Sequence, residues 1–255
     1  MRRVVFNQKG GVGKSTITCN LAAIAAQRGR RTLVVDLDRQ ANSSRYLLGD
    51  AADQPAPGAA EFFDTTLRFM LRTPETADFI VATKWDNLHL MAAGPALDEL
   101  HGKLESRQKI YKLREALVGL AHAYDEVWID TPPALNFYTR SALIAATGCL
   151  IPFDCDDFSR RALYGLLDSV KEIQADHNRE LVVEGIVVNQ FQLRASLPQR
   201  TVQELIDEGL PVCEPYLSAS VKIKESHEAA CPMVHLDPRH KVTQEFIALY
   251  DALQR

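Results

Sequence analysis

The residues that could do chemistry begin directly after the first apolar run of the chain. Residues 7–16 read Asn-Gln-Lys-Gly-Gly-Val-Gly-Lys-Ser-Thr, and an amphipathic segment follows them. Glycines let backbone N–H groups turn toward an anion, and the start of a helix adds a favourable dipole. The sequence therefore predicts a phosphate-binding loop, with Lys14 at the β- and γ-phosphates and the Ser15 hydroxyl on Mg²⁺. Its nucleotide-binding residues are Gly10, Gly11, Val12, Gly13, Lys14, Ser15 and Thr16.

This loop departs from the usual pattern GxxxxGK[ST] in two places. Gln8 stands where the first glycine belongs, and an additional lysine, Lys9, precedes the paired glycines. A tight strand–helix turn with chance basic residues is the alternative. Three glycines, the GK[ST] end and the flanking strand and helix patterns together favour phosphate binding.

Three carboxylates end apolar runs further along the chain. Asp36 and Asp38 lie two residues apart, which places both on one face of a strand. Alone, the pair is typical of a helix-capping aspartate beside a solvated one, but the glycine loop makes a shared polar site the better interpretation. We expect Asp36 to support the water shell of a metal. Asp130 follows three apolar residues and precedes Thr131-Pro132-Pro133, a position that suits direct or water-mediated binding of Mg²⁺.

Residues 9–15, Lys-Gly-Gly-Val-Gly-Lys-Ser, resemble the deviant Walker A motif of the ParA/MinD family, whose hallmark is the additional lysine. Residues 35–43 are similar to the family's second motif, usually DxDPQGNAS, although Arg39 and Ala41 replace its proline and glycine. Residues 124–133 resemble its YDxxxxDxPP motif. The resemblance covers nearly the whole chain, is weakest at residues 49–85, and is closest to the ParA/Soj-type partitioning ATPases.

The resemblance implies an ATPase that uses ATP and Mg²⁺ and forms a homodimer in its ATP state. It assigns catalytic roles to Lys9, Lys14 and Asp38: Lys9 reaches the partner's nucleotide, and Asp38 orients the attacking water. Asn189 matches the position that reads adenine, and the chain has no Asn-Lys-x-Asp guanine motif, so ATP is favoured over GTP. An ordinary strand-end turn is the alternative for Asn189. Hydrolysis is expected to be slow until a ParB-like or other activating partner binds.

The elements that must position these residues are strand-like runs alternating with helical patterns. This order predicts a doubly wound α/β protein, a P-loop NTPase with a mostly parallel sheet and helices on both faces, built as a single domain over residues 1–255. Residues 50–60 are predicted to be a loop or a mobile insertion. The expected strands are Arg3–Asn7, Thr32–Asp36, Leu88–Ala92, Glu126–Asp130, Gly148–Phe153 and Leu181–Asn189. The expected helices are Lys14–Gln27, Ala96–Ala123, Arg160–Ala175, Gln199–Glu208 and Val242–Leu253.

The sequence indicates the cargo, which is the DNA, membrane or protein that the ATPase positions, less directly than it indicates the nucleotide site. In partitioning relatives the ATP-bound dimer binds DNA non-specifically through basic residues late in the chain, which implies DNA contacts by Arg194, Arg200, Lys222 and Lys224 here, with Arg239, His240 and Lys241 as further candidates. Ordinary solvated charge is the alternative for each of them. A MinD-like positioning ATPase, bound to membrane or protein without DNA, is the rival function, but acids on the polar face of residues 242–255 argue against membrane insertion.

Composition sets the remaining limits. The net charge of −4 gives no global basic field, so a DNA partner must be read by a local patch. The apolar runs are too short for a membrane span or a signal peptide. Five cysteines without a CxxC pair exclude a disulfide framework and argue against iron–sulfur relatives. These features predict a cytoplasmic protein, and the resemblance implies a bacterial one with the nucleoid as a further location.

Overall fold

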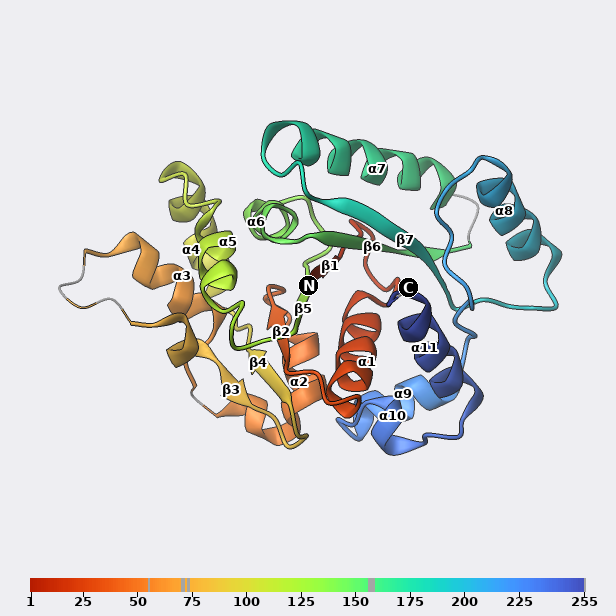
Figure 1. Ribbon diagram of the computed structural model, residues 1–255, viewed down its shortest axis with the longest axis horizontal. Coiled ribbons are helices and arrows are strands. Elements are labelled where there is room, and N and C mark those ends of the chain that lie inside the picture. Colours follow the sequence, from red (N-terminus) through yellow and green to blue (C-terminus); the bar gives the residue numbers. More distant parts are fainter. Residues whose placement is uncertain (55, 70–71, 73, 156–158, 255) are drawn as a thin grey trace.

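The computed structural model describes residues 1–54, 56–69, 72, 74–155 and 159–254. A twisted sheet runs through the middle of the molecule, with helices on both faces (Figure 1). The strands are β1 (Arg2–Val5), β2 (Thr32–Asp36), β3 (Val81–Ala82), β4 (Leu88–Met91), β5 (Glu126–Asp130), β6 (Gly148–Asp154) and β7 (Val182–Asn189). The helices are α1 (Lys14–Gln27), α2 (Asn42–Leu48), α3 (Ala59–Leu67), α4 (Leu97–Ser106), α5 (Lys112–Gly119), α6 (Phe137–Ala145), α7 (Ser159–Asp176), α8 (Ser196–Asp207), α9 (Val221–Glu228), α10 (Met233–Leu236) and α11 (Lys241–Ala252).

The order of the strands confirms the predicted doubly wound sheet. It is β3-β4-β2-β5-β1-β6-β7, and every pairing is parallel except the short antiparallel β3–β4 pair. The chain therefore extends the sheet on one side of β1 and later on the other. In such sheets ligands bind beyond the carboxyl ends of the strands, where the connections diverge. The glycine loop, Asp36 and Asp130 all lie at that edge, and Asp36 is directly opposite Asp130 in the β2–β5 register.

Alternating side chains of the buried strands build two apolar layers, one on each face of the sheet. Val4, Val35 and Ile129 pack with α3, α4, α5, α6, α7 and α8. Val5, Val34 and Trp128 pack on the other face with α1, α2, α10 and α11. Strands buried on both faces read as continuous apolar runs, which is why the sequence predicted them within about two residues.

The helix predicted over Ala96–Ala123 is wrong in one respect, because the structure divides it into α4 and α5. Gln108 adopts a left-handed conformation, with φ of 54°, between the two helices. The Lys109 amide donates to the Leu104 carbonyl and the Gln108 amide to that of Glu105. This is the hydrogen-bond pattern that closes many helices, usually with glycine at the left-handed position. No glycine marks this helix end, so no local signal in the sequence indicated it.

The segment predicted as a loop over residues 50–60 is partly regular. A short 3-10 helix covers Gly49–Asp53, and α3 begins at Ala59. The sequence analysis also missed the short helices α2, α3, α6, α9 and α10. Asn136 caps α6 by accepting from the Thr139 amide, and Ser220 caps α9 by accepting from the Lys222 amide. Such caps compensate for the few turns that a short helix has.

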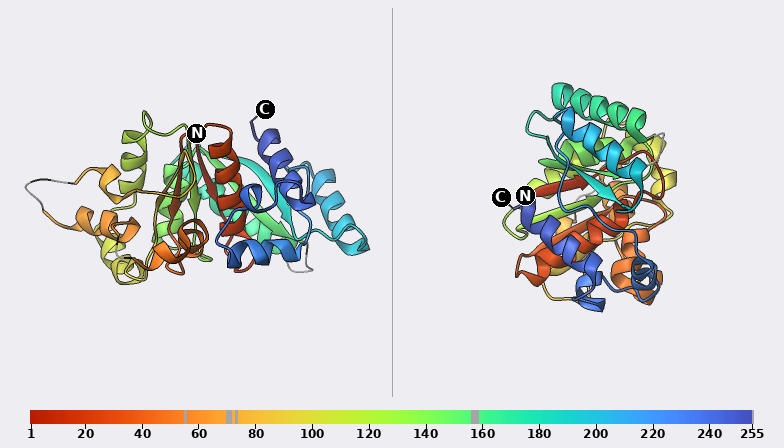
Figure 2. Two further views of the ribbon diagram at one scale, coloured as in Figure 1. Left: turned by 90° about the horizontal axis from the view of Figure 1, so that it is seen from below. Right: turned by 90° about the vertical axis from the view of Figure 1, so that its right-hand side faces the viewer.

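Helix α11 packs against α1 through its apolar face (Figure 2). Val242, Phe246, Leu249 and Tyr250 are all buried there. The Arg3 guanidinium, also buried, donates to the Leu253 carbonyl just beyond the helix. This apolar face is therefore covered by the protein itself. Among the helices in the described ranges, none has the length and hydropathy needed to cross a membrane.

Candidate functional site

The glycine loop is held in shape by side chains from neighbouring strands. Gly11 and Gly13 have φ of 78° and 91°, which L side chains rarely adopt. The Asn7 amide donates to the Pro152 carbonyl, and its carbonyl oxygen accepts from the Lys9 amide. On the far side Asn189 donates to the Val12 carbonyl over 2.9 Å. The glycine loop thus leads directly into α1 at Lys14, and its binding of an anion stays a prediction.

Lys14 lies inside this loop and is nearly buried. Its ammonium donates to the Lys9 carbonyl over 3.0 Å. Desolvation lowers the pKa of Lys14, while the carboxylates of Asp130 and Asp38 counteract that shift. A partly desolvated cation beside a curled backbone suits binding of phosphate oxygens.

Asp38 and Asp36 differ in what their carboxylates touch. Asp38 lines a cavity of about 560 Å³ together with Lys14, Ser15 and the loop glycines. Both oxygens of Asp36 accept hydrogen bonds, one from the Asp38 amide and the other from the amide and hydroxyl of Ser44. Asp36 therefore shapes the loop that presents Asp38. Its proposed support of a metal's water shell stays a prediction.

Asp130 fits the predicted Mg²⁺ position. One carboxylate oxygen accepts from the Ser43 hydroxyl over 2.7 Å, and the other is buried without a hydrogen-bond partner among the described residues. Desolvation raises the pKa of Asp130, and contacts with Ser15, Ser43 and Lys14 oppose it. The pKa of Asp36 is also raised, mainly by burial and secondly by repulsion from the Asp130 carboxylate. A divalent cation beside Ser15 would neutralise this acidic pair and satisfy the unpartnered oxygen through a bound water.

Lys9 lies on the exposed rim of the loop. Its ammonium is 3.7 Å from a carboxylate oxygen of Asp154, at the end of β6. Lys9 therefore does not line the cavity that contains Lys14. Its role at a partner's nucleotide stays a prediction.

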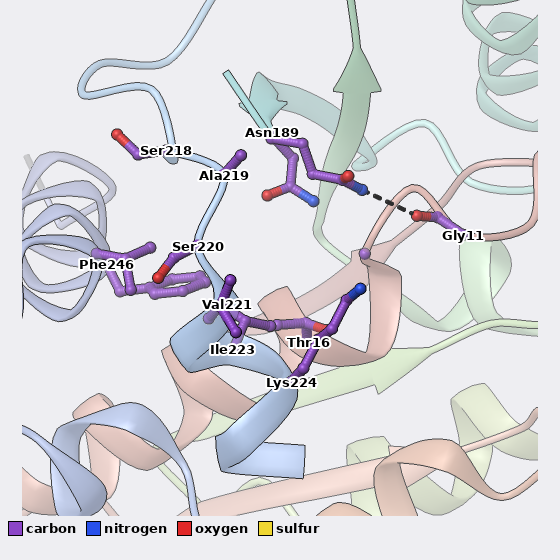
Figure 3. Close-up of a pocket in the computed structure, with 13 residues that line it drawn as sticks. Gly11, Thr16, Asn189, Ser218, Ala219, Ser220, Val221, Ile223, Lys224 and Phe246 are labelled. Atoms are coloured by element: carbon purple, nitrogen blue, oxygen red, sulfur yellow. Dashed lines mark hydrogen bonds between the residues drawn. The ribbon is translucent and has the colours of Figure 1, made fainter. Parts of the chain in front are cut away.

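A second cavity continues the site toward β7. It has a volume of about 430 Å³, and Asn189, residues 218–221 and Phe246 contribute to its wall (Figure 3). The two cavities share Gly11, Gly13 and Thr16. The side with Lys14 suits phosphates, and the side with Asn189 suits a base. Adenine recognition by Asn189 remains a prediction, because its amide nitrogen is already bonded to Val12.

The basic residues predicted to contact DNA do not form one free patch. Lys222 pairs with Glu225 over 3.0 Å, and Arg200 lies 3.9 Å from Glu204. Arg194 is exposed in the connection between β7 and α8. Lys224 lines the cavity on the side of Asn189. Of the further candidates, Arg239 is exposed, His240 caps α11 and Lys241 pairs with Glu245.

Three residues at the phosphate cavity were missed from the sequence: Arg45, Tyr46 and His227. The His227 ring lies on that of Tyr46, with centroids 4.4 Å apart, and its Nε2 is 3.0 Å from the Thr16 hydroxyl. Desolvation lowers the pKa of His227. Only the spacing of Arg45 and Tyr46 behind the second motif could have indicated them. Nothing local connects His227 to Thr16, which is 211 residues away.

A parallel doubly wound sheet with a glycine loop after β1 and carboxylates ending β2 and β5 defines a P-loop nucleotide-binding protein. Residues 3–183 match the family described as AAA domain. The chain is 31% identical to a chromosome partitioning protein ParA of Myxococcus xanthus, over 96% of this chain and 84% of that protein. It is 34% identical to a chromosome-partitioning ATPase Soj of Thermus thermophilus, over 80% and 76% of the two chains.

A solved structure gives the same picture. Cobyrinic acid a,c-diamide synthase from Mycobacterium smegmatis, with a bound ATP analogue and magnesium, superposes with a TM-score of 0.85 at 26% identity, covering 100% of this chain and 94% of that one. The chain belongs to the ParA/MinD family, as its loop motif indicated.

Proposed function

We propose that this protein is a ParA-like ATPase that hydrolyses ATP to ADP and phosphate and dimerises around ATP. The observation that carries the proposal is one cavity lined by the glycine loop, Lys14, Ser15 and Asp38. Relatives named as a partitioning protein and a partitioning ATPase, and a structural neighbour with a bound ATP analogue and magnesium, support it.

Phosphoryl transfer needs in-line positioning and charge neutralisation more than covalent chemistry. Loop amides and Lys14 hold the β- and γ-phosphates. Asp38, facing the same cavity, accepts a hydrogen bond from the attacking water and aligns it. Ser15 and Asp130 would hold Mg²⁺, which neutralises phosphate charge when bound. Lys9 of a second copy would supply further positive charge to the phosphates, so hydrolysis depends on dimerisation. Turnover stays slow until an activating partner binds.

The cargo follows from the family and not from the site. We infer that the ATP-bound dimer binds DNA without sequence preference, acting in DNA segregation or cargo positioning in the bacterial cytoplasm and on the nucleoid. Arg194, Arg200 and Lys222 are the exposed or half-buried cations that support this. Glu204 beside Arg200 and Glu225 beside Lys222 predict a weak interaction that is sensitive to salt. The covered apolar face of α11 disfavours the membrane-bound alternative.

Fluorescence anisotropy with a labelled duplex of arbitrary sequence, at several salt concentrations and with ATP or ADP, tests the DNA inference. Each phosphate contact contributes roughly 0.9 to the slope of log affinity against log salt. Arg200→Glu with Lys222→Glu removes two contacts per subunit and should flatten the slope for a dimer by up to about four such units.

A control with the same change in net charge is Lys112→Glu with Lys171→Glu, on α5 and α7. These lysines pair with Glu115 and Asp168 and are not among the proposed DNA contacts. The control should keep most of the salt slope. Equal losses in both double variants would show a net-charge effect and remove the assignment. If the wild type binds ATP but no DNA in any nucleotide state, the function moves to positioning of protein cargo.

A further inference from the structure

Helix α9 presents two basic side chains to the nucleotide cavities. Lys224 and His227 are three residues apart, so they share one face of the helix. Lys224 lines the cavity that contains Asn189, and His227 lines the cavity that contains Lys14. Lys222 instead pairs with Glu225. The sequence grouped Lys222 and Lys224 together as DNA contacts, but the structure gives them different surroundings.

Thr16 marks the place where the two cavities meet. It lines both of them, together with Gly11 and Gly13. His227 contacts the Thr16 hydroxyl over 3.0 Å. In Figure 3 the Lys224 side chain extends from α9 past Thr16 toward the start of α1. A nucleotide with its base near Asn189 and its terminal phosphates at Lys14 would place its α-phosphate at this junction.

The electrostatics of the junction call for an anion. The N-terminus of a helix carries partial positive charge, so a lysine aimed at it is repelled unless an anion lies between them. Among the described residues, no carboxylate lies within ion-pair distance of Lys224, whereas Lys222 has one. An α-phosphate would accept hydrogen bonds from the α1 amides on one side and from α9 on the other.

We propose that Lys224 and His227 bind the α-phosphate of the nucleotide, so that α9 forms the second wall of the site opposite the glycine loop. This inference rests on the proposed ATP-binding function. It assigns Lys224 to the nucleotide and not to DNA. Because ATP, ADP and AMP share the α-phosphate, loss of either side chain weakens all three to a similar degree.

Isothermal titration calorimetry of the full chain with Mg-ATP and Mg-ADP tests the proposal, with melting temperatures as a check on folding. Lys224→Met should weaken both nucleotides by the same factor, about 10-fold to 100-fold, which is the usual value of a hydrogen bond to a charged group. Lys224→Arg should retain most of the affinity. Lys171→Met, the same change on exposed α7, should leave both affinities unchanged. His227→Ala should weaken both nucleotides, and His227→Gln, which keeps a donor, should recover part of the loss.

Three results would overturn the inference while leaving ATP binding intact. The first is Lys224→Met and His227→Ala variants that both bind ATP and ADP within twofold of the wild type. The second is a loss confined to ATP, which would place Lys224 at the γ-phosphate. The third is lower DNA affinity in Lys224→Met with unchanged nucleotide affinity. A wild type that binds no nucleotide would instead refute the proposed function itself.

Discussion

Substitution of Gly13 should weaken nucleotide binding, because the geometry of the loop requires glycine at this position. Its φ of 91° disfavours any side chain, and a Cβ there would overlap the amide nitrogen of Asn189. The left-handed backbone costs about 1–2 kcal/mol for a non-glycine residue, and loss of the Asn189–Val12 hydrogen bond adds about 1 kcal/mol. Gly13→Ala should therefore disfavour the binding-competent loop by about 2–3 kcal/mol. Nucleotide affinity should fall about 30-fold to 150-fold, because only the competent fraction binds.

Calorimetric titration with Mg-ADP measures this loss, and Gly102→Ala is the control. Gly102 lies in α4, where a Cβ would meet nothing within 4 Å, so nucleotide affinity should not change and stability should rise slightly. Asn189→Ala removes the group that a new Cβ would strike. In that background Gly13→Ala should cost only the free energy of the left-handed backbone. The coupling free energy between the two substitutions should therefore be about 1 kcal/mol. Wild-type affinity in Gly13→Ala would refute the loop geometry.

Three further changes are predicted. Lys14→Ala should abolish measurable nucleotide binding by calorimetry, because the phosphates lose their buried cation; wild-type affinity would contradict the site. Arg3→Met should lower the free energy of unfolding by about 3–5 kcal/mol in urea, because Glu126, 3.4 Å away, stays buried without its cation; a loss below about 1 kcal/mol would refute this. Hydrogen bonds from Arg31 lower the pKa of Asp125 to about 2, so this carboxylate stabilises the fold above its unfolded pKa of roughly 3.9 and the contribution is lost as pH falls toward 2. Asp125→Asn should therefore be less stable than wild type at pH 6 and equal to it near pH 2, and a difference that does not depend on pH would exclude the linkage.

The glycine loop and its strands were predictable because their signals are local. An apolar run, three glycines and a lysine lie close together in the sequence. They specify both the turn between strand and helix and the positive charge of Lys14. The break between α4 and α5 was not predictable in this way. Gln108 takes a conformation that the sequence usually marks with glycine, and tertiary packing of Leu104 and Leu113 stabilises the two separate helices.

The acidic residues show a different limit. The two-residue spacing predicted one polar site for Asp36 and Asp38, but such a spacing does not distinguish a carboxylate that closes a loop from one that faces a ligand. That difference depends on the Ser44 amide and hydroxyl, which bond to Asp36. Lys224 and His227 show the strongest limit. Their position beside Thr16 arises from the packing of α9 near α1, and no local pattern encodes it.

We propose an ATP-dependent dimer that hydrolyses ATP, with Asp38 and Lys9 in separate roles. Light scattering coupled to gel filtration, with ATP and Mg²⁺, tests it on Asp38→Ala and Lys9→Ala side by side. We expect Asp38→Ala to bind ATP, to hydrolyse it poorly and to elute as a stable dimer of twice the chain mass. We expect Lys9→Ala to bind ATP and to stay monomeric. Normal hydrolysis by Asp38→Ala, or an active ATP-dependent dimer of Lys9→Ala, would contradict this proposal.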